Sequence, residues 1–218
     1  KSLPSVRKKS VLLAPTGRAA KVLSQRAGKA AFTIHKKIYQ KTSAANGAVK
    51  LSIAINLHTD TLFIIDEASM IGDYTMQNDG NISSRNLLDD LISYVYSGKR
   101  CKLIFIGDVG QLPPVGSDFS PALNEEYLRN NFFGFNIEEF KLTEVLRQAV
   151  ESDILYNATL LRSAPDDTYP SFQMRKKPDL LRIDGLELQD AIESSYNNVG
   201  MDETVIITRS NKRANAFN

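Results

Sequence analysis

The stretch Thr61-Leu62-Phe63-Ile64-Ile65-Asp66-Glu67 joins five residues with strand character directly to two adjacent acids. Its first five positions are apolar or β-branched and do not alternate with polar residues, which is typical of a strand covered on both faces of a parallel sheet. In an open parallel sheet, ligands bind beyond the carboxyl ends of the strands. We therefore expect Asp66 and Glu67 to point into the functional crevice.

The segments on either side repeat an alternation of strand and helix. Amphipathic helices are predicted at 18–26, ending near Gly28, and at 86–96, between the two clearest strands. This order predicts an α/β protein whose parallel sheet is flanked by helices. The apolar strand segments lie at 11–14, 61–65, 102–106 and 204–208.

Two stretches depart from this alternation. Residues 42–58 contain Asn46-Gly47 followed by apolar residues in period two, which predicts a β-hairpin. Residues 163–184 are rich in Pro, Asp and Lys, which predicts a long surface loop.

Basic residues are concentrated at the start of the chain. Residues 1–50 contain twelve of the 27 Lys and Arg residues and none of the 25 acids, in a chain of net charge +2. Such a block indicates a surface that faces phosphates, although chance clustering of solvated lysines explains it equally well. No apolar run approaches the roughly 20 residues that cross a bilayer. The single cysteine, Cys101, matches no metal-ligand or redox spacing, so we expect a buried thiol and a reducing, cytoplasmic setting.

The acid pair admits two interpretations. Asp66 is suited to hold Mg²⁺ and Glu67 to polarise an attacking water, because carboxylate oxygens serve both tasks. The alternative is an acid that caps a helix after a strand, which is common.

A second motif, Gly-Asp-Val-Gly-Gln-Leu-Pro-Pro-Val-Gly at 107–116, also follows a buried strand. Its glycines and prolines predict a stiff loop of special shape, and Gln111 offers a neutral donor and acceptor. That chemistry suits a sensor of a terminal phosphate or of the attacking water. A simple turn would explain the prolines but not the whole pattern.

Two further motifs carry positive charge. In Ala-Pro-Thr-Gly-Arg-Ala-Ala-Lys at 14–21, a strand turns sharply into a helix, whose free N–H groups favour an anion. This segment lacks the spacing of a phosphate-binding P-loop, so we interpret it as a contact for a nucleic-acid phosphate. In Leu-Thr-Glu-Val-Leu-Arg-Gln at 142–148, Arg147 could neutralise charge on a transferred phosphoryl group.

Taken in order, these motifs resemble those of RecD-type, superfamily 1 DNA helicases of the exodeoxyribonuclease V alpha-subunit type. Pif-type helicases share the Gln-Leu-Pro-Pro-Val element, but the segment at 14–21 favours the RecD type. The resemblance covers nearly the whole chain and rests on APTGRAAK (14–21), TIH (33–35), DEASM (66–70), GDVGQLPPVG (107–116), LTEVLRQ (142–148) and TRSNKRAN (208–215).

The resemblance implies two RecA-like motor domains, at 1–138 and at 139–218, with ATP between them and single-stranded DNA across the top. A hairpin insertion at 42–58 falls where such helicases carry a strand-separating pin, although a plain β-ribbon is an equal alternative. For His35, a core or surface histidine is as good an interpretation as a DNA contact. The implied residues are Asp66 for Mg²⁺, Glu67, Gln111 and Arg147 for catalysis on ATP, and Pro15, Thr16, Arg18 and His35 for DNA.

The implied activity is that of an ATP hydrolase that unwinds duplex DNA at junctions, in DNA repair and recombination, alone or with nuclease subunits. No Walker A sequence and no motifs V and VI occur in these 218 residues, so we expect the fragment to be inactive by itself. Two alternative functions remain open. One is a non-catalytic nucleic-acid-binding module, and the other is a metal-dependent nuclease that uses Asp66, Glu67 and Asp108.

Overall fold

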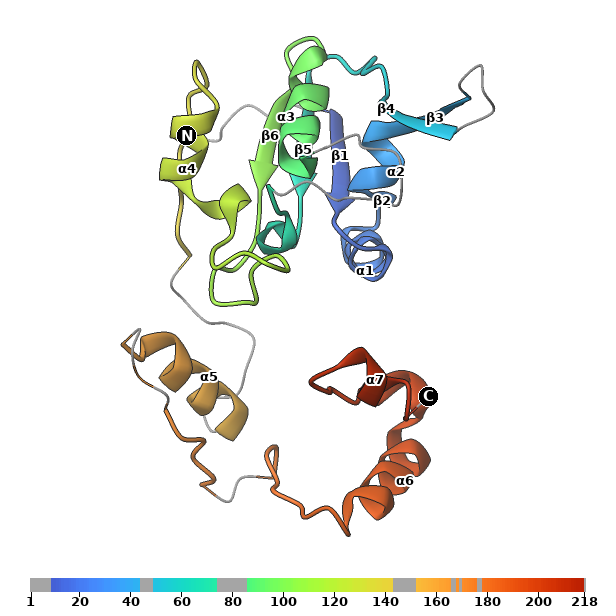
Figure 1. Cartoon of the computed structure of the whole chain (residues 1–218), viewed down its shortest axis with the longest axis vertical. Coiled ribbons are helices and arrows are strands. Elements are labelled where there is room, and N and C mark those ends of the chain that lie inside the picture. The colour runs from blue at the N-terminus through green and yellow to red at the C-terminus, as the bar shows by residue number, and fades with distance from the viewer. Residues whose placement is uncertain are drawn as a thin grey trace, which may run out of the picture. The chain divides into compact units, whose positions relative to one another are not determined.

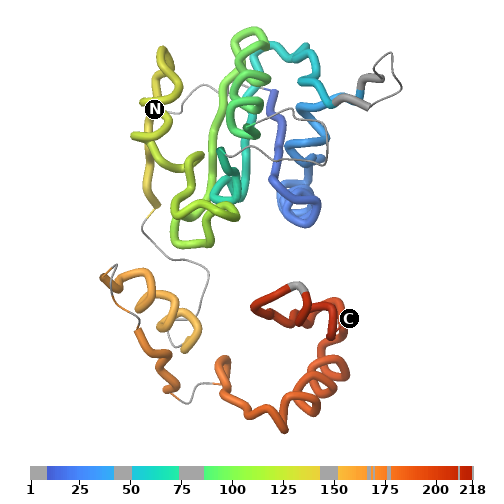
Figure 2. The backbone as a smooth tube through the Cα atoms, viewed as in Figure 1, coloured from blue at the N-terminus to red at the C-terminus, as the bar shows by residue number. Residues whose placement is uncertain are grey.

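The computed structural model describes residues 9–43, 49–73, 86–142, 152–165, 168, 170–175 and 178–217. The chain divides into two compact units, Lys1–Leu142 and Thr143–Asn218. Figures 1 and 2 trace the first unit in blue to yellow-green and the second in orange to red.

Four parallel strands form the sheet of the first unit, in the order β2-β1-β5-β6 (Figure 1). In the register of the central strands, Leu13 lies opposite Ile65, and Ile65 lies opposite Phe105. The sheet is flanked by helices, which confirms the predicted RecA-like α/β arrangement. The strands are β1 (Lys9–Ala14), β2 (Ala31–Thr33), β5 (Thr61–Ile65) and β6 (Lys102–Phe105).

The two predicted helices of this unit form with the expected boundaries. Helix α1 (Gly17–Ala27) begins where the Thr16 hydroxyl accepts the Ala19 N–H and ends at Gly28, which has the left-handed φ of 60°. Helix α3 (Leu87–Ser97) begins where the Asn86 side chain accepts N–H groups of the first turn. No helix among the described residues is long and apolar enough to cross a membrane.

Short helices occupy the connections after the strands. They are α2 (Ile34–Ile38), the 3₁₀ turns η1 (Ala68–Met70) and η2 (Pro121–Leu123), and α4 (Glu125–Asn131).

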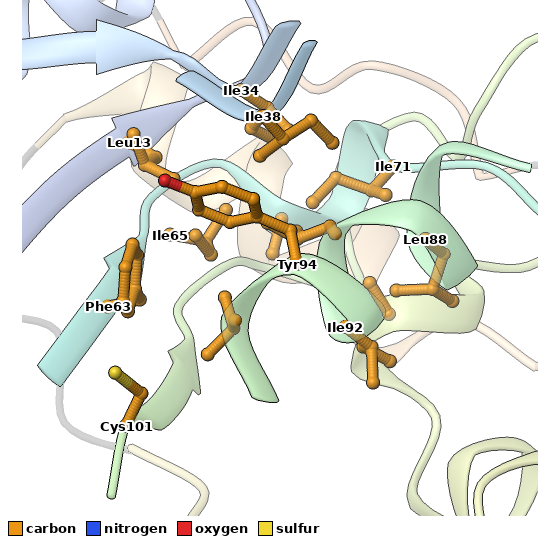
Figure 3. Packing of buried hydrophobic residues seen from close by; sticks show 14 of the residues in the cluster. Leu13, Ile34, Ile38, Phe63, Ile65, Ile71, Leu88, Ile92, Tyr94 and Cys101 are labelled. Atoms are coloured by element: carbon orange, nitrogen blue, oxygen red, sulfur yellow. The ribbon is translucent and has the colours of Figure 1, made fainter. Parts of the chain in front are cut away.

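The core lies between α3 and the sheet. Figure 3 shows Tyr94 of α3 beside Ile65 of β5, and both belong to the cluster that also contains Phe63 and Ile92. The Phe63 and Tyr94 rings meet edge to face, with centroids 6.0 Å apart. Burial of each such side chain contributes about 1.5–3 kcal/mol to the free energy of folding. Cys101 belongs to this cluster and is 6% exposed, which confirms the predicted buried thiol.

A two-stranded antiparallel ribbon follows α2. It consists of β3 (Tyr39–Ser43) and β4 (Val49–Ile53), so the antiparallel pair overlaps the predicted hairpin region 42–58 but begins three residues before it. The Asn46-Gly47 turn lies outside the described residues. The Tyr39 hydroxyl donates to the Asp90 carboxylate of α3 at 2.8 Å, so the base of the ribbon is bonded to the main body of the unit.

The second unit contains helices and irregular segments in its described residues. These helices are α5 (Asp153–Ser163), α6 (Leu188–Val199), the turn η3 (Met201–Glu203) and α7 (Asn211–Ala214). The strand predicted at 204–208 was wrong, because this segment has no ladder partner within the described part of the chain. Its apolar, β-branched run supplies strand propensity, but a strand also needs a neighbour to accept its hydrogen bonds.

Polar groups hold a loop against α5. Asp153 is fully buried and accepts from the Arg175 side chain at 2.9 Å and from the Arg175 N–H at 2.7 Å. Asp179 accepts from the Ser152 hydroxyl and from two N–H groups of the first turn. These bonds lower the pKa of Asp179 to about 2, the Ser152 hydrogen bond being the largest cause. The described residues of the predicted surface loop at 163–184 are mostly exposed and form no strand.

Candidate nucleotide and nucleic-acid site

The carboxyl ends of all four sheet strands lie at one edge of the sheet, because the strands are parallel and in register. Backbone bonds continue the ladder one step beyond the strands. The Asp66 N–H donates to the Leu13 carbonyl at 2.9 Å, and the Ile106 N–H donates to the Ile65 carbonyl at 2.8 Å. The segments that follow β1, β5 and β6 are therefore fixed beside one another.

The acid pair adopts a constrained backbone at this edge. Asp66 and Glu67 are both half-buried, and the Asp66 carboxylate accepts the Glu67 N–H at 3.0 Å. Glu67 has φ 53° and ψ 39°, a left-handed conformation that costs a residue with a side chain about 1–2 kcal/mol. Its side chain makes no capping bond to η1. Helix capping therefore does not explain Glu67, while strain of this kind clusters at functional sites.

The loop after β6 is anchored at both ends to η1. At its start, a Cβ added to Gly107 would lie 2.8 Å from Leu123 Cδ1 and 2.9 Å from the Ser69 N atom, so only glycine allows this approach. At its end, the Ser120 hydroxyl donates to the Ser69 carbonyl at 3.0 Å. The loop is consequently held against the segment that directly follows Asp66 and Glu67.

Gln111 lies within this anchored loop. Its N–H donates to the Asp108 carbonyl at 3.0 Å, and the Asp108 carboxylate accepts the Gly110 N–H at 2.9 Å, which closes a tight turn. Gln111 is exposed, and in the part of the chain that the structure describes its carboxamide makes no hydrogen bond. The side chain is thus free to bind a ligand at the carboxyl edge of the sheet.

Arg147, the remaining residue of the predicted nucleotide set, lies outside the described residues. Its role as an arginine finger stays a prediction.

The predicted DNA-contact residues follow the two neighbouring strands β1 and β2. Thr16 caps α1, and Thr33 caps α2 by accepting the Lys36 N–H at 3.2 Å. Ala14 and Thr33 are register partners, so the two helix starts are adjacent. Each threonine hydroxyl accepts a bond from the backbone and keeps its own proton for donation to an anion.

The side chains around these helix starts are accessible. Pro15 is half-buried, whereas Arg18 and His35 are exposed. His35 is therefore not a core histidine, and its ring lies 5.6 Å from the Tyr39 ring, tilted by 51°. The structure thus brings Pro15, Thr16, Arg18 and His35 to two adjacent strand ends.

Two residues near these helix starts were missed by the sequence analysis. Phe32 is 39% exposed although it belongs to a sheet strand, and the Lys36 ammonium lies 6.0 Å from the centre of its ring. The only sequence signal was an aromatic residue directly before Thr33 in the basic block.

The described residues contain no group of three or more His, Cys, Asp or Glu side chains that could hold a metal ion.

Comparison with known proteins agrees with this geometry. A family model described as an AAA domain matches residues 1–117, more than half of the chain. The chain is also similar to the ATP-dependent RecD2 DNA helicase of Deinococcus radiodurans, with 30% identity over 148 residues. The match covers 67% of this chain and 17% of that protein, so the chain spans less than a fifth of its relative's length. Both matches support the RecD-like helicase family that the motifs resemble.

Proposed function

The chain belongs to the AAA-domain family, and from that premise we propose that it forms part of the motor of a RecD-like, superfamily 1 DNA helicase. Such a motor couples ATP hydrolysis to movement on single-stranded DNA and to unwinding of duplex DNA. One observation carries the proposal. At a single sheet edge, the acid pair after β5 meets the Gln111 loop after β6, beside two capped helix starts after β1 and β2.

The residues after β5 and β6 suit the chemistry of ATP hydrolysis. Asp66 supplies a half-buried carboxylate, the oxygen ligand that Mg²⁺ prefers, and Glu67 supplies a second carboxylate to polarise the attacking water. When bound, Mg²⁺ neutralises charge on the transferred phosphoryl group. The exposed carboxamide of Gln111 contacts the γ-phosphate or that water. Arg147 is proposed as the arginine finger on the strength of its motif.

The residues after β1 and β2 suit a DNA strand. The α1 start offers N–H groups and the Thr16 hydroxyl, Arg18 adds a positive charge, and Pro15 and His35 line the same edge. Contacts of this kind recognise phosphates rather than bases, so little sequence preference is expected.

The parts of the motor are assigned as follows. Residues 1–138 are assigned to the first motor domain and 139–218 to the second, a proposal that the division of the chain near residue 142 supports. The β3–β4 ribbon is a candidate strand-separating pin. Polarity from 5′ to 3′ and an association with nuclease or recombination subunits are family expectations.

Enzyme assays on the full-length protein test the proposal. Its ATP hydrolysis should require Mg²⁺ and rise on addition of single-stranded DNA, and it should unwind a duplex with a single-stranded tail. The 218 residues alone, which contain no P-loop sequence, should give a nearly flat calorimetric titration with ATP and Mg²⁺. DNA binding without any ATP hydrolysis would instead identify a binding module, and cleavage of DNA without ATP would identify a nuclease.

A further inference from the structure

Helix α1 carries small and polar side chains on the face that it turns toward β2. The positions 17, 20, 21, 24 and 25 recur at the spacing of one helix face, and α1 lies beside β2 (Figure 1). At this spacing, a helix packed on a sheet usually carries large apolar residues. Here the residues leave a groove of about 350 Å³, lined by Gly17, Ala20, Lys21, Ser24, Gln25, Ala31, Phe32, Thr33 and Lys36.

We call this feature the Phe32 groove. Its aromatic residue is 39% exposed, whereas Phe63 in the neighbouring core is fully buried. The Lys36 ammonium lies 6.0 Å from the centre of the Phe32 ring, and Lys21 lines the groove from α1. Among the described residues, no acid lines the groove, and the sequence has none in residues 1–50. The groove therefore combines a partly exposed aromatic ring with positive charge that no described residue of its lining neutralises.

The groove is also open where α1 begins. A Cβ added to Gly17 would meet no atom within 4 Å. The groove is open to solvent and not enclosed, and its volume of about 350 Å³ leaves room for one small organic group. The groove thus offers an aromatic ring, two ammonium groups and room for one small group. These features suit a ligand in which a flat, uncharged ring is attached to phosphates.

We propose that the Phe32 groove binds one base of single-stranded DNA, stacked on the Phe32 ring, while the adjoining phosphates contact Lys21 and Lys36. This inference rests on the proposed function and adds a base-binding position to the phosphate contacts after β1 and β2. Stacking tolerates every base, because each base has a π-face. A base within a duplex is already stacked on its neighbours, so the groove selects single strands.

A tryptophan probe tests the stacking directly. None of these 218 residues is tryptophan, so in Phe32→Trp of this 218-residue chain the fluorescence of the introduced indole reports on position 32. Addition of oligothymidylate should quench that fluorescence, because the base stacks on the indole. An abasic oligonucleotide of equal length and charge should leave it nearly unchanged.

Affinity measurements provide the second test. Phe32→Leu keeps an apolar side chain but removes the π-face, and it should weaken oligothymidylate binding by about 5- to 150-fold. Binding of the abasic oligonucleotide should change little, and Phe32→Trp should restore the preference for bases. Phe133→Leu is the matched control, because Phe133 is 83% exposed and does not line the groove. Thermal melting verifies that each variant is folded.

The outcomes separate the two proposals. If the unaltered protein binds neither oligonucleotide, the helicase proposal itself is contradicted. If it binds oligothymidylate, while Phe32→Leu binds equally well and Phe32→Trp shows no quenching, only the base-binding role is overturned. Should Phe32→Leu fail to fold, the quenching of Phe32→Trp still decides the question.

Discussion

Replacement of Gly107 by alanine should destabilise the first unit and disturb the site. The added methyl group would lie 2.8 Å from Leu123 Cδ1, 2.9 Å from the Ser69 N atom and 3.2 Å from the Ala68 N atom. Two of these three neighbours are backbone atoms of η1, which cannot rotate away. Forcing an extra methyl group into such a space costs about 1–3 kcal/mol.

Part of this cost is offset in the unfolded chain. Alanine restricts the unfolded backbone more than glycine does, which favours folding by about 0.4–1 kcal/mol. Taking the middle of each range, the net loss in the free energy of unfolding should be about 1.3 kcal/mol. Because Gly107 also holds the Gln111 loop against the segment after Glu67, ATP hydrolysis by the full-length protein should fall as well.

Gly17→Ala is the matched control for this substitution. A Cβ at Gly17 meets nothing within 4 Å, and the residue lies in the first turn of α1, where alanine is favoured over glycine. Urea denaturation followed by circular dichroism should show a neutral or slightly stabilised Gly17→Ala and a destabilised Gly107→Ala. Equal stability of the two variants, with unchanged hydrolysis, would refute the close approach of the β6 loop to η1.

Two further predictions concern charge. Arg18→Ala should weaken single-stranded DNA binding equally for unrelated sequences, and it should lower the salt slope of log K by about 0.7. Fluorescence anisotropy measures both effects, and an unchanged slope would show that Arg18 does not contact the DNA. Arg26→Ala is its control, since Arg26 lies about 12 Å farther along the same helix. Because the folded-state pKa of Asp179 is lowered from 3.8 to about 2, its stabilisation of α5 is present above pH 4 and is lost as pH falls toward 2. In circular dichroism, Asp179→Asn should flatten that acid transition, and an unaltered transition would contradict the capping role.

Much of the fold was predictable because its signals are local. Thr16 and Gly28 mark the ends of α1, Asn86 marks the start of α3, and the apolar run of β5 is readable without any knowledge of its neighbours. The segment at 204–208 has an equally good local signal. Because this segment nevertheless forms no strand, strand formation must also depend on a neighbouring strand, which the local sequence does not supply.

The candidate site was predictable in its residue types but not in its contacts. Asp66, Glu67 and Gln111 were identified from the segments in which they occur, but the strain at Glu67 emerges only from the folded backbone. The need for glycine at 107 depends on η1 and η2, which are distant in sequence. The Phe32 groove likewise depends on α1 lying beside β2, so it could not be predicted from an isolated aromatic residue in the sequence.

Glu67→Gln in the full-length protein tests whether Glu67 is the base that activates water. The substitution keeps the size and shape of the side chain but removes the negative charge. ATP binding, measured by calorimetry, should remain within a few-fold of the unaltered protein. DNA-stimulated ATP hydrolysis should fall by about 10²–10⁴-fold, the usual contribution of a general base. Hydrolysis that survives within a few-fold, with intact ATP and DNA binding, would contradict the assignment of the catalytic site to the carboxyl end of β5.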